Sequence, residues 1–175
     1  MSTAVLHLLD HTQLGGGETS FVNYLSAARR RSDEFRPVVV LRGDGPLAER
    51  LRELDVPIEY VNYPLRLRRG LLPLLALEAV DRIEEIITRH AIQLVHANQF
   101  FGLVHGGRAA RRRRVPCLWT CHGWWELDNA FKRMLARRLA QRVLCVSEAV
   151  RQATAGALGP KVPTATNYLG IEPFA

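Results

Sequence analysis

Residues 8–25, LLDHTQLGGGETSFVNYL, lead from an apolar segment through three consecutive glycines into a stretch with helical spacing. Glycine costs backbone entropy on folding, so a cluster of three indicates positive φ angles or a close approach of the backbone to another group. The N-terminus of a helix offers unpaired N–H groups and a partial positive charge, which attract an anion. The segment therefore predicts a strand, a phosphate-binding glycine turn and a helix. The alternative is that the glycines serve only a tight turn.

Outward from this segment, apolar stretches with strand character alternate with helical ones along the chain. We expect strands at 3–9, 36–41, 58–61, 92–96, 115–120, 143–146 and 162–167. We expect helices at 18–31, 47–54, 72–90, 100–113, 127–142 and 147–156, the last with Ser147 as its N-cap. Near-continuous apolar strands separated by helices are typical of a parallel sheet covered on both faces. The sequence thus predicts a Rossmann-like, doubly wound α/β domain of about six or seven strands.

The composition fits one globular domain that spans residues 1–175, with 47% apolar and 23% charged residues. The net charge of +7 comes almost wholly from arginine and favours acidic partners such as phosphates, nucleotides or anionic lipid. The arginine run at 111–114 falls at a predicted helix end, where cations suit the helix dipole. The first ten residues lack the basic region of a secretory signal, so we expect a cytoplasmic protein.

Three cysteines, Cys117, Cys121 and Cys145, lie in strand-like segments. Their odd number and position predict buried, reduced thiols rather than a disulfide framework. A zinc site from Cys117, Cys121 and His122 is the alternative, but alternate residues of a strand point to opposite faces. We therefore expect no metal.

Polar, aromatic and glycine residues follow several predicted strands at the edge where open parallel sheets bind ligands. They are Asp10, His11 and Gly15–Gly17, then His96, Asn98 and Gln99, then Cys121, His122, Gly123, Trp124 and Trp125, and finally Ser147 and Glu148. His96 has a structural alternative as a hydrogen-bonded strand residue, and the two tryptophans could instead cap the core. His122 is the strongest candidate, because imidazole exchanges a proton near neutral pH and Gly123 leaves room beside it.

The dinucleotide-binding fingerprint G-x-G-x-x-G is only partly present. Gly15 and Gly17 match its first two glycines, but Ser20 stands at the third position. Arg42 occupies the end of the second predicted strand, where an acidic residue would bind the ribose, and Asp44 follows two residues later. The sequence therefore gives weak support to a nicotinamide cofactor.

Five motifs carry a resemblance to a known family. They are GGGE at 15–18, GPLAERLRELDVPIEYV at 45–61, LVHANQFFGLVHGGRAAR at 94–111, VPCLWTCHGWW at 115–125 and AQRVLCVSEAVRQ at 140–152. In this order they resemble the N-terminal domain of a family 4 glycosyltransferase with the GT-B fold. The ending TNYLGIEPF (166–174) is similar to the passage into that family's second domain, although Tyr168 and Leu169 are inserted and Glu172 replaces Asp. We expect an acceptor-side domain without its C-terminal donor-binding domain.

The resemblance implies retaining transfer of a sugar from a UDP- or GDP-type nucleotide sugar, with no metal or other cofactor. It places Gly16 and Gly17 near the donor diphosphate and His122, as the catalytic residue, near the transferred sugar. The predicted acceptor-binding residues are Asn98, His96, Gly123, Trp124, Arg66 and Arg68. The expected partners are the nucleotide sugar, a sugar or lipid-linked acceptor, and the C-terminal domain.

Three alternatives stay open at this point. The basic and apolar stretch at 65–80 could contact the inner membrane face, or it could be a basic loop followed by a core helix. A GT-B-type sugar-nucleotide epimerase or an NAD(P)-binding oxidoreductase would share the parallel-sheet architecture. A basic binding module is the non-enzyme alternative, but no aromatic residues alternate with the arginines as nucleic-acid stacking requires, so we expect no nucleic-acid partner.

Overall fold

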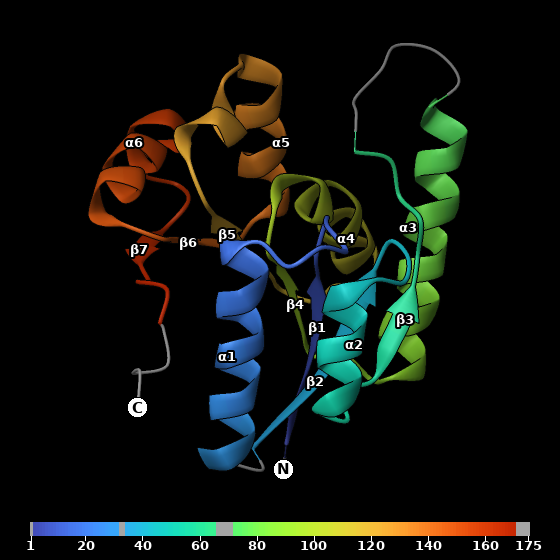
Figure 1. Ribbon diagram of the computed structural model, residues 1–175. Helices are drawn as coiled ribbons and strands as arrows, with labels where there is room; N and C mark the ends of the chain where they lie inside the picture. Colours follow the sequence, from blue (N-terminus) through green and yellow to red (C-terminus); the bar gives the residue numbers. More distant parts are fainter. Residues whose placement is uncertain (1, 32–33, 66–71, 171–175) are drawn as a thin grey trace.

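Within the residues that the computed structural model describes, 2–31, 34–65 and 72–170, seven parallel strands form one sheet (Figure 1). The strand order is β3-β2-β1-β4-β5-β6-β7. The chain builds the sheet outward from β1 to β3, crosses back to place β4 on the other side of β1, and continues outward to β7. The switch point of the strand order therefore lies between the neighbouring strands β1 and β4. The strands are β1 (Thr3–Leu8), β2 (Phe35–Leu41), β3 (Ile58–Tyr60), β4 (Leu94–Ala97), β5 (Cys117–Cys121), β6 (Arg142–Cys145) and β7 (Thr164–Thr166). The predicted Rossmann-like, doubly wound sheet is confirmed.

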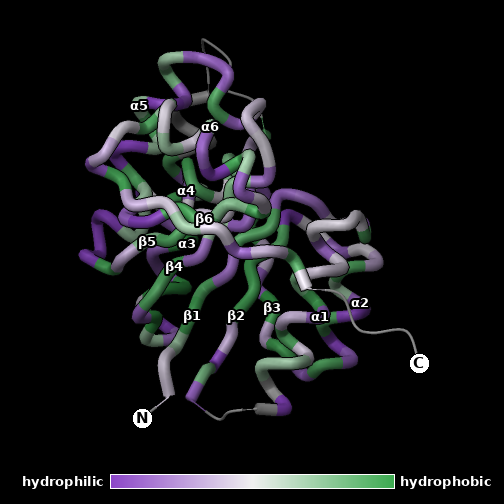
Figure 2. Tube along the Cα trace, turned by 90° about the vertical axis from the view of Figure 1, so that its left-hand side faces the viewer, coloured by the Kyte–Doolittle hydropathy of each residue, from purple (hydrophilic) through white to green (hydrophobic). Residues whose placement is uncertain are grey.

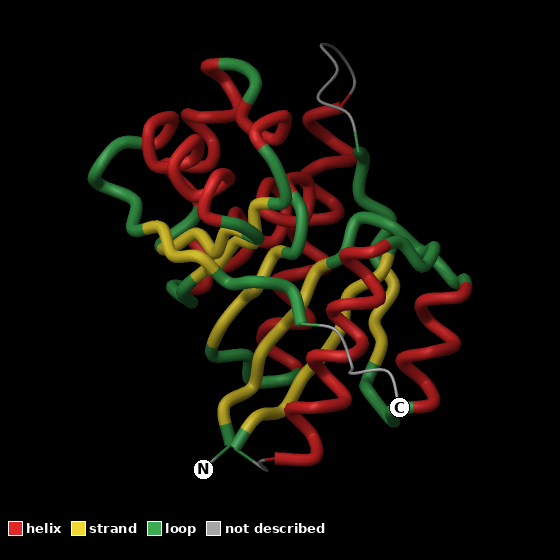
Figure 3. The backbone as a smooth tube through the Cα atoms, turned by 60° about the vertical axis from the view of Figure 1, so that its left-hand side comes forward, coloured by secondary structure: helices red, strands yellow, loops and turns green. Residues whose placement is uncertain are grey.

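Helices lie on both faces of the sheet (Figure 3). They are α1 (Gly16–Arg31), α2 (Pro46–Glu53), α3 (Leu72–Arg89), α4 (Phe100–Arg113), α5 (Ala130–Leu139) and α6 (Glu148–Leu158), with a 3-10 helix η1 at Trp124–Leu127. The buried residues of α1 and α2 share one apolar cluster with β2, and those of α3, α4 and α5 belong to a larger cluster. Apolar residues therefore follow the strands through the middle of the molecule (Figure 2).

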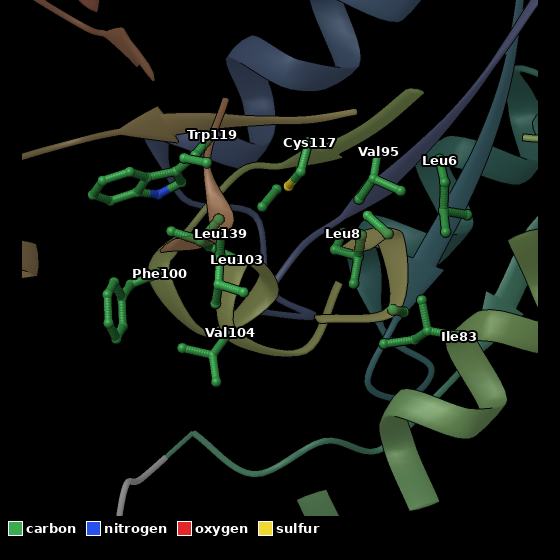
Figure 4. Close-up of a cluster of buried hydrophobic side chains, with 14 of the residues drawn as sticks. Leu6, Leu8, Ile83, Val95, Phe100, Leu103, Val104, Cys117, Trp119 and Leu139 are labelled. Carbon is green, nitrogen blue, oxygen red and sulfur yellow. The ribbon is translucent and has the colours of Figure 1, made fainter. Parts of the chain in front are cut away.

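The larger cluster is centred on α4, which packs directly on β1 and β4. Leu8, Val95 and Trp119 are buried against it, together with Leu103 of the helix itself (Figure 4). Gly106 permits this close approach, because a Cβ placed there would lie 2.7 Å from Leu8 Cδ1. The close packing of α4 on β1 and β4 thus depends on glycines of the helix such as Gly106. The sequence alone did not indicate this role for them.

Several predicted boundaries shift in the structure. Helix α1 begins at Gly16 rather than residue 18, so Gly16 and Gly17 form part of its first turn. The predicted helix at 127–142 is wrong as one element, because the Asn129 side chain accepts a hydrogen bond from Lys132 N (2.9 Å) and starts α5 afresh. The residues before it form the 3-10 turn η1, and Arg142 belongs to β6.

The end of the chain shows one confirmed cap and one misplaced helix end. Ser147 caps α6 as predicted, since its Oγ accepts a hydrogen bond from Val150 N at 3.2 Å. The helix does not end near Gly156 but continues to Leu158. It ends at Gly159, whose φ of +74° is a backbone conformation that glycine adopts far more readily than other residues.

Cysteines and surface arginines lie as the sequence indicates. Cys117, Cys121 and Cys145 are buried free thiols, and burial raises the pKa of the first two to about 12. Arg112, in the last turn of α4, pairs with Asp81 and Glu84 of α3 at 2.8 Å. No helix in the described part of the chain is long and apolar enough to cross a bilayer.

The glycine contact between α4 and β1 generates a paired stability prediction. Gly106→Ala forces a methyl group against Leu8 and Val95, so we expect a loss of about 1–3 kcal/mol in the free energy of unfolding. Gly156→Ala, on α6, has no heavy atom within 4 Å and should raise stability by about 0.5–1 kcal/mol. Urea unfolding of both variants measures the difference. Equal effects would contradict the packing of α4 on β1.

Candidate functional site

The candidate site lies at the carboxyl ends of β1, β4 and β5, beside the first turn of α1 (Figure 1). Asp10 follows β1, Asn98 follows β4 and His122 follows β5 directly. Asn98 N donates to Leu8 O at 2.9 Å, which holds the segment after β4 against the end of β1. The strand order therefore brings together residues that are far apart in the sequence, at the switch point where open α/β sheets bind ligands.

Asp10 caps the N-terminus of α4. Its Oδ1 accepts hydrogen bonds from Gly102 N (2.7 Å) and Tyr63 Oη (3.0 Å), and its Oδ2 accepts one from Phe101 N (3.0 Å). Burial raises the pKa of the Asp10 carboxyl, while these hydrogen bonds act in the opposite direction. Its contacts give Asp10 a structural role that ties β1 and the segment after β3 to α4.

Gln99 links the same region to α1. Its Oε1 accepts from Asp10 N, and its Nε2 donates to Glu18 Oε1, both at 2.9 Å. Glu18 is buried in the first turn of α1, with its carboxyl folded so closely over Gly15 that a Cβ there would lie 2.8 Å from Oε2. The Glu18 carboxylate at the start of α1 is thus held by a hydrogen bond from Gln99, in the segment after β4, and it is also favoured by the helix dipole.

The His122 ring lies directly against Gly17. A Cβ on Gly17 would be 3.2 Å from His122 Cε1, a distance that leaves no room for an ordinary side-chain contact. Burial lowers the pKa of His122, although a hydrogen bond to the main chain of Asn98 and the negative charge of Glu18 favour the protonated ring. The imidazole at the first turn of α1 is therefore neutral at neutral pH.

Three buried polar atoms at this edge have no hydrogen-bond partner within the described residues. They are His122 Nε2, Asn98 Nδ2 and Glu126 Oε2. Buried polar groups are usually paired, so unpaired ones require an explanation. An unpaired amide donor and an unpaired ring nitrogen at one edge of the sheet are suited to the hydroxyl groups of a ligand.

Two tryptophans follow the site on η1. Trp124 and Trp125 are 68% and 54% exposed, so the alternative that they cap the core is wrong. Their rings meet edge to face at 5.3 Å. Gly123 lies beneath Trp125, whose Cη2 would be 2.2 Å from a Cβ at that position. The space that this glycine leaves is filled by Trp125, while Trp124 presents its ring to solvent.

His96 is held within the sheet. Its Nδ1 lies 3.1 Å from His7 Nδ1, and its Nε2 lies 2.8 Å from Thr120 Oγ1. Burial and the nearby His122 lower its pKa to about 4. Both ring nitrogens are therefore engaged, which favours the structural alternative over acceptor binding.

The predicted residues Arg66 and Arg68 lie outside the described residues, as does most of the basic part of the stretch at 65–80. Arg42 is described, and its guanidinium bonds Tyr63 O (2.7 Å) and Asn62 Oδ1 (3.2 Å) at the end of β2. A cation thus occupies the place where a nicotinamide cofactor would need a carboxylate. In the part of the chain that the structure describes, no group of three or more His, Cys, Asp or Glu side chains could hold a metal ion.

Sequence reasoning missed Glu126 and Tyr63. Glu126 accepts a hydrogen bond from His122 N at 2.7 Å, and Tyr63 donates to Leu9 O and Asp10. The spacing of four residues between His122 and Glu126 could have indicated that this carboxyl accepts a hydrogen bond from the main chain of His122. No signal marked Tyr63, because its partner lies 53 residues earlier in the chain.

The profile of Glycosyltransferase Family 4 matches residues 14–173. The chain belongs to this family. The predicted GT-B N-terminal half is confirmed by a structure of HepE from Anabaena in complex with UDP and glucose, at 26% identity and a TM-score of 0.74. That match covers 96% of this chain and 45% of HepE.

Two further structures share the fold alone. A glycosyltransferase from Rickettsia africae ESF-5 matches at 17% identity and a TM-score of 0.73, over 95% of this chain and 43% of that one. A putative UDP-N-acetylglucosamine 2-epimerase from Listeria monocytogenes matches at 13% identity and a TM-score of 0.67, over 94% of this chain and 44% of that one. The family 4 chain spans less than half the length of these proteins, and it matches none of the curated proteins at a significant level.

The contact between Gly17 and His122 predicts opposite outcomes for two adjacent glycines. In Gly17→Ala the new methyl group displaces the imidazole, so the His122 Cε1–H signal in NMR spectra should shift and its pKa should change. Gly16→Ala, one position earlier, meets no atom within 4 Å and should leave that signal in place. A similar response in both variants would show that the ring does not rest on Gly17.

The buried His7–His96 pair predicts acid sensitivity. A histidine pKa of about 4 in the fold, against an ordinary 6.5, means that the unfolded chain binds the extra proton, so stability is lost as pH falls from about 6.5 to about 4. His96→Gln should remove about 2–3 kcal/mol of the difference between the unfolding free energies at about pH 7.5 and about pH 4.5. Urea unfolding at both pH values measures it, and an unchanged pH dependence would contradict the neutral pair.

Proposed function

We propose that this family 4 domain is the acceptor-side half of a glycosyltransferase that moves a sugar from a UDP- or GDP-type nucleotide sugar to an acceptor with retention of configuration. Family membership supports the reaction class, and the complex of HepE with UDP and glucose supports the type of donor. The single observation that carries the proposal is the neutral His122 ring against Gly17 in the first turn of α1, with Nε2 unpaired.

The first turn of α1 supplies the groups that such a reaction needs. In the transfer the bond between the anomeric carbon and the diphosphate breaks, a bond to the acceptor oxygen forms on the same face, and the acceptor proton is released. Negative charge grows on the diphosphate, and preorganised N–H donors stabilise it most effectively. The N–H groups of Gly16, Gly17 and Glu18 have no partner within their helix, so they are available to it.

His122 and Asn98 are placed to orient the sugars. The neutral imidazole exchanges hydrogen bonds with a hydroxyl of the transferred sugar through Nε2, and Asn98 Nδ2 donates to a hydroxyl of the acceptor. The exposed ring of Trp124 forms one wall on the acceptor side. From the family resemblance and their charge, Arg66 and Arg68 take part in binding a phosphorylated or lipid-linked acceptor. His96 and Gly123 support these groups from within rather than by direct contact.

The remaining parts of the proposal concern the surroundings of the domain. The donor is held by a C-terminal domain, which faces the carboxyl edge of the sheet, and the reaction uses no metal or other cofactor. The protein works in the cytoplasm, with peripheral contact to the inner membrane face when its acceptor is lipid-linked. The match to a putative 2-epimerase is one of fold, and no observation on the described residues favours that activity.

Loss of the imidazole tests the proposal. His122→Ala, in a polypeptide that carries this domain together with a donor-binding half, should lower kcat for sugar transfer by about 10²-fold or more while the fold is kept. Transfer is measured as release of UDP or GDP from a panel of nucleotide sugars.

His90→Ala is the matched control. Its imidazole bonds Glu59 at 2.7 Å, away from the candidate site, so turnover should be unchanged. Full activity in His122→Ala would overturn the assignment of the site.

A further inference from the structure

Glu126 is a buried carboxyl in the turn η1, where Leu127 is buried as well. It is only 8% exposed, although Trp124 and Trp125 before it project into solvent. Glutamate is rarely buried to this extent without partners that require it. The short helix η1 therefore exposes two tryptophans and buries an acidic side chain beside Leu127, an arrangement that hydrophobic burial alone does not explain.

The Glu126 carboxyl joins the segment that holds His122 to the start of α4. Its Oε1 accepts a hydrogen bond from His122 N at 2.7 Å, and the main chains of Gly123 and Phe100 lie close enough to favour its ionised form. Phe100 is the first residue of α4, whose next two N–H groups are taken by Asp10. Two carboxyls from different loops thus lie at one helix N-terminus, and one of them also accepts a hydrogen bond from the main chain of His122.

We propose that Glu126 is a positioning residue for His122, which fixes the main chain at the end of β5 to α4 and so keeps the imidazole against Gly17. The inference rests on the proposed function only in that His122 is taken to meet the sugar. Its structural part, the dependence of the imidazole position on Glu126, rests on the hydrogen bond from His122 N to Glu126 Oε1 and on the burial of that carboxyl.

The charge of Glu126 changes in the neutral range. Burial and the neighbouring Asp10 carboxyl raise its pKa to about 7, while main-chain hydrogen bonds from His122, Gly123 and Phe100 act in the opposite direction. The ionised carboxylate is the stronger acceptor for these N–H groups, so protonation weakens its hold on His122. The position of the imidazole therefore becomes dependent on pH near 7.

Other titratable and charged groups lie on the elements packed around Glu126. Asp10 is held by three hydrogen-bond donors, and the Cys121 and Cys145 thiols on β5 and β6 have raised pKa values. From α5, Lys132 and Arg133 bond main-chain oxygens of η1, namely those of Trp125 and Leu127. From α6, the neutral Thr154 faces Cys121.

The experiment is an NMR titration of this chain from about pH 5 to about pH 9, following the Glu126 side-chain carboxyl carbon and His122 Cε1–H. In the unchanged protein both signals should show an inflection near pH 7, in addition to the titration of His122 at lower pH. In Glu126→Gln the inflection of His122 near pH 7 should disappear, since the amide keeps an acceptor oxygen but cannot ionise.

Glu148→Gln is the control for removal of a carboxyl near the site. Glu148 opens α6, and its pairing with Arg151 and Thr166 lowers its pKa to about 2, so its loss should leave the inflection near pH 7 intact. An inflection of His122 that persists in Glu126→Gln overturns the inference. If Glu126→Gln does not fold, the unchanged protein still tests the inference. A Glu126 carboxyl carbon signal that shows no transition between about pH 6 and about pH 8 would then overturn it.

Activity separates this inference from the proposed function. In a polypeptide with a donor-binding half, kcat should fall below about pH 7, and Glu126→Gln should flatten that pH profile with little effect on KM. Loss of transfer in His122→Ala together with an unchanged pH profile and His122 signal in Glu126→Gln would refute the inference and leave the proposed function standing. Full transfer in His122→Ala, together with loss of the His122 inflection in Glu126→Gln, would refute the proposed role of His122 in transfer and leave the positioning of His122 by Glu126 standing.

Discussion

The N-terminus of α4 is the point on which the candidate site depends. Helix N–H groups there have no partner within the helix, and the site lies where water is largely excluded, so they need acceptors from elsewhere. Asp10 supplies acceptors for Phe101 and Gly102, and the Glu126 carboxyl lies beside the main chain of Phe100. Since these two carboxyls belong to the segments after β1 and β5, satisfying one helix end fixes the relative position of three strand ends.

Close contacts at glycines complete the arrangement. Gly106 lets α4 approach β1, and Gly17 lets the His122 ring approach α1. Neither has a positive φ angle, so backbone freedom does not explain them and the absence of a side chain does. The three consecutive glycines at 15–17 thus have different roles: Gly15 lies under the Glu18 carboxyl, Gly16 is unobstructed, and Gly17 supports the imidazole.

The sequence predicted the architecture well because its signals are local. Apolar strands such as TAVLHL and FRPVVVL, each followed by a helical stretch, imply a parallel sheet without reference to any distant residue. The break between η1 and α5 was missed because the capping Asn129 stands within a continuous helical pattern. The sequence indicates which candidate residues follow the ends of the strands, but it does not indicate which of them are joined by hydrogen bonds. Asp10 and Tyr63, or Glu126 and Phe100, meet only through the fold, and no spacing along the chain encodes such pairs.

The three tryptophans lie in two very different environments, and this gives the domain a built-in optical probe. Trp119 is fully buried in the core, whereas Trp124 and Trp125 are exposed beside the candidate site. Indole emission shifts to longer wavelength in water, so the spectrum separates into a constant blue component from the core and a red component from the site edge. Aqueous quenchers reach only the latter. Any sugar or second domain that covers this edge will therefore be visible by its shielding of the red component, without a label and without knowledge of the substrate.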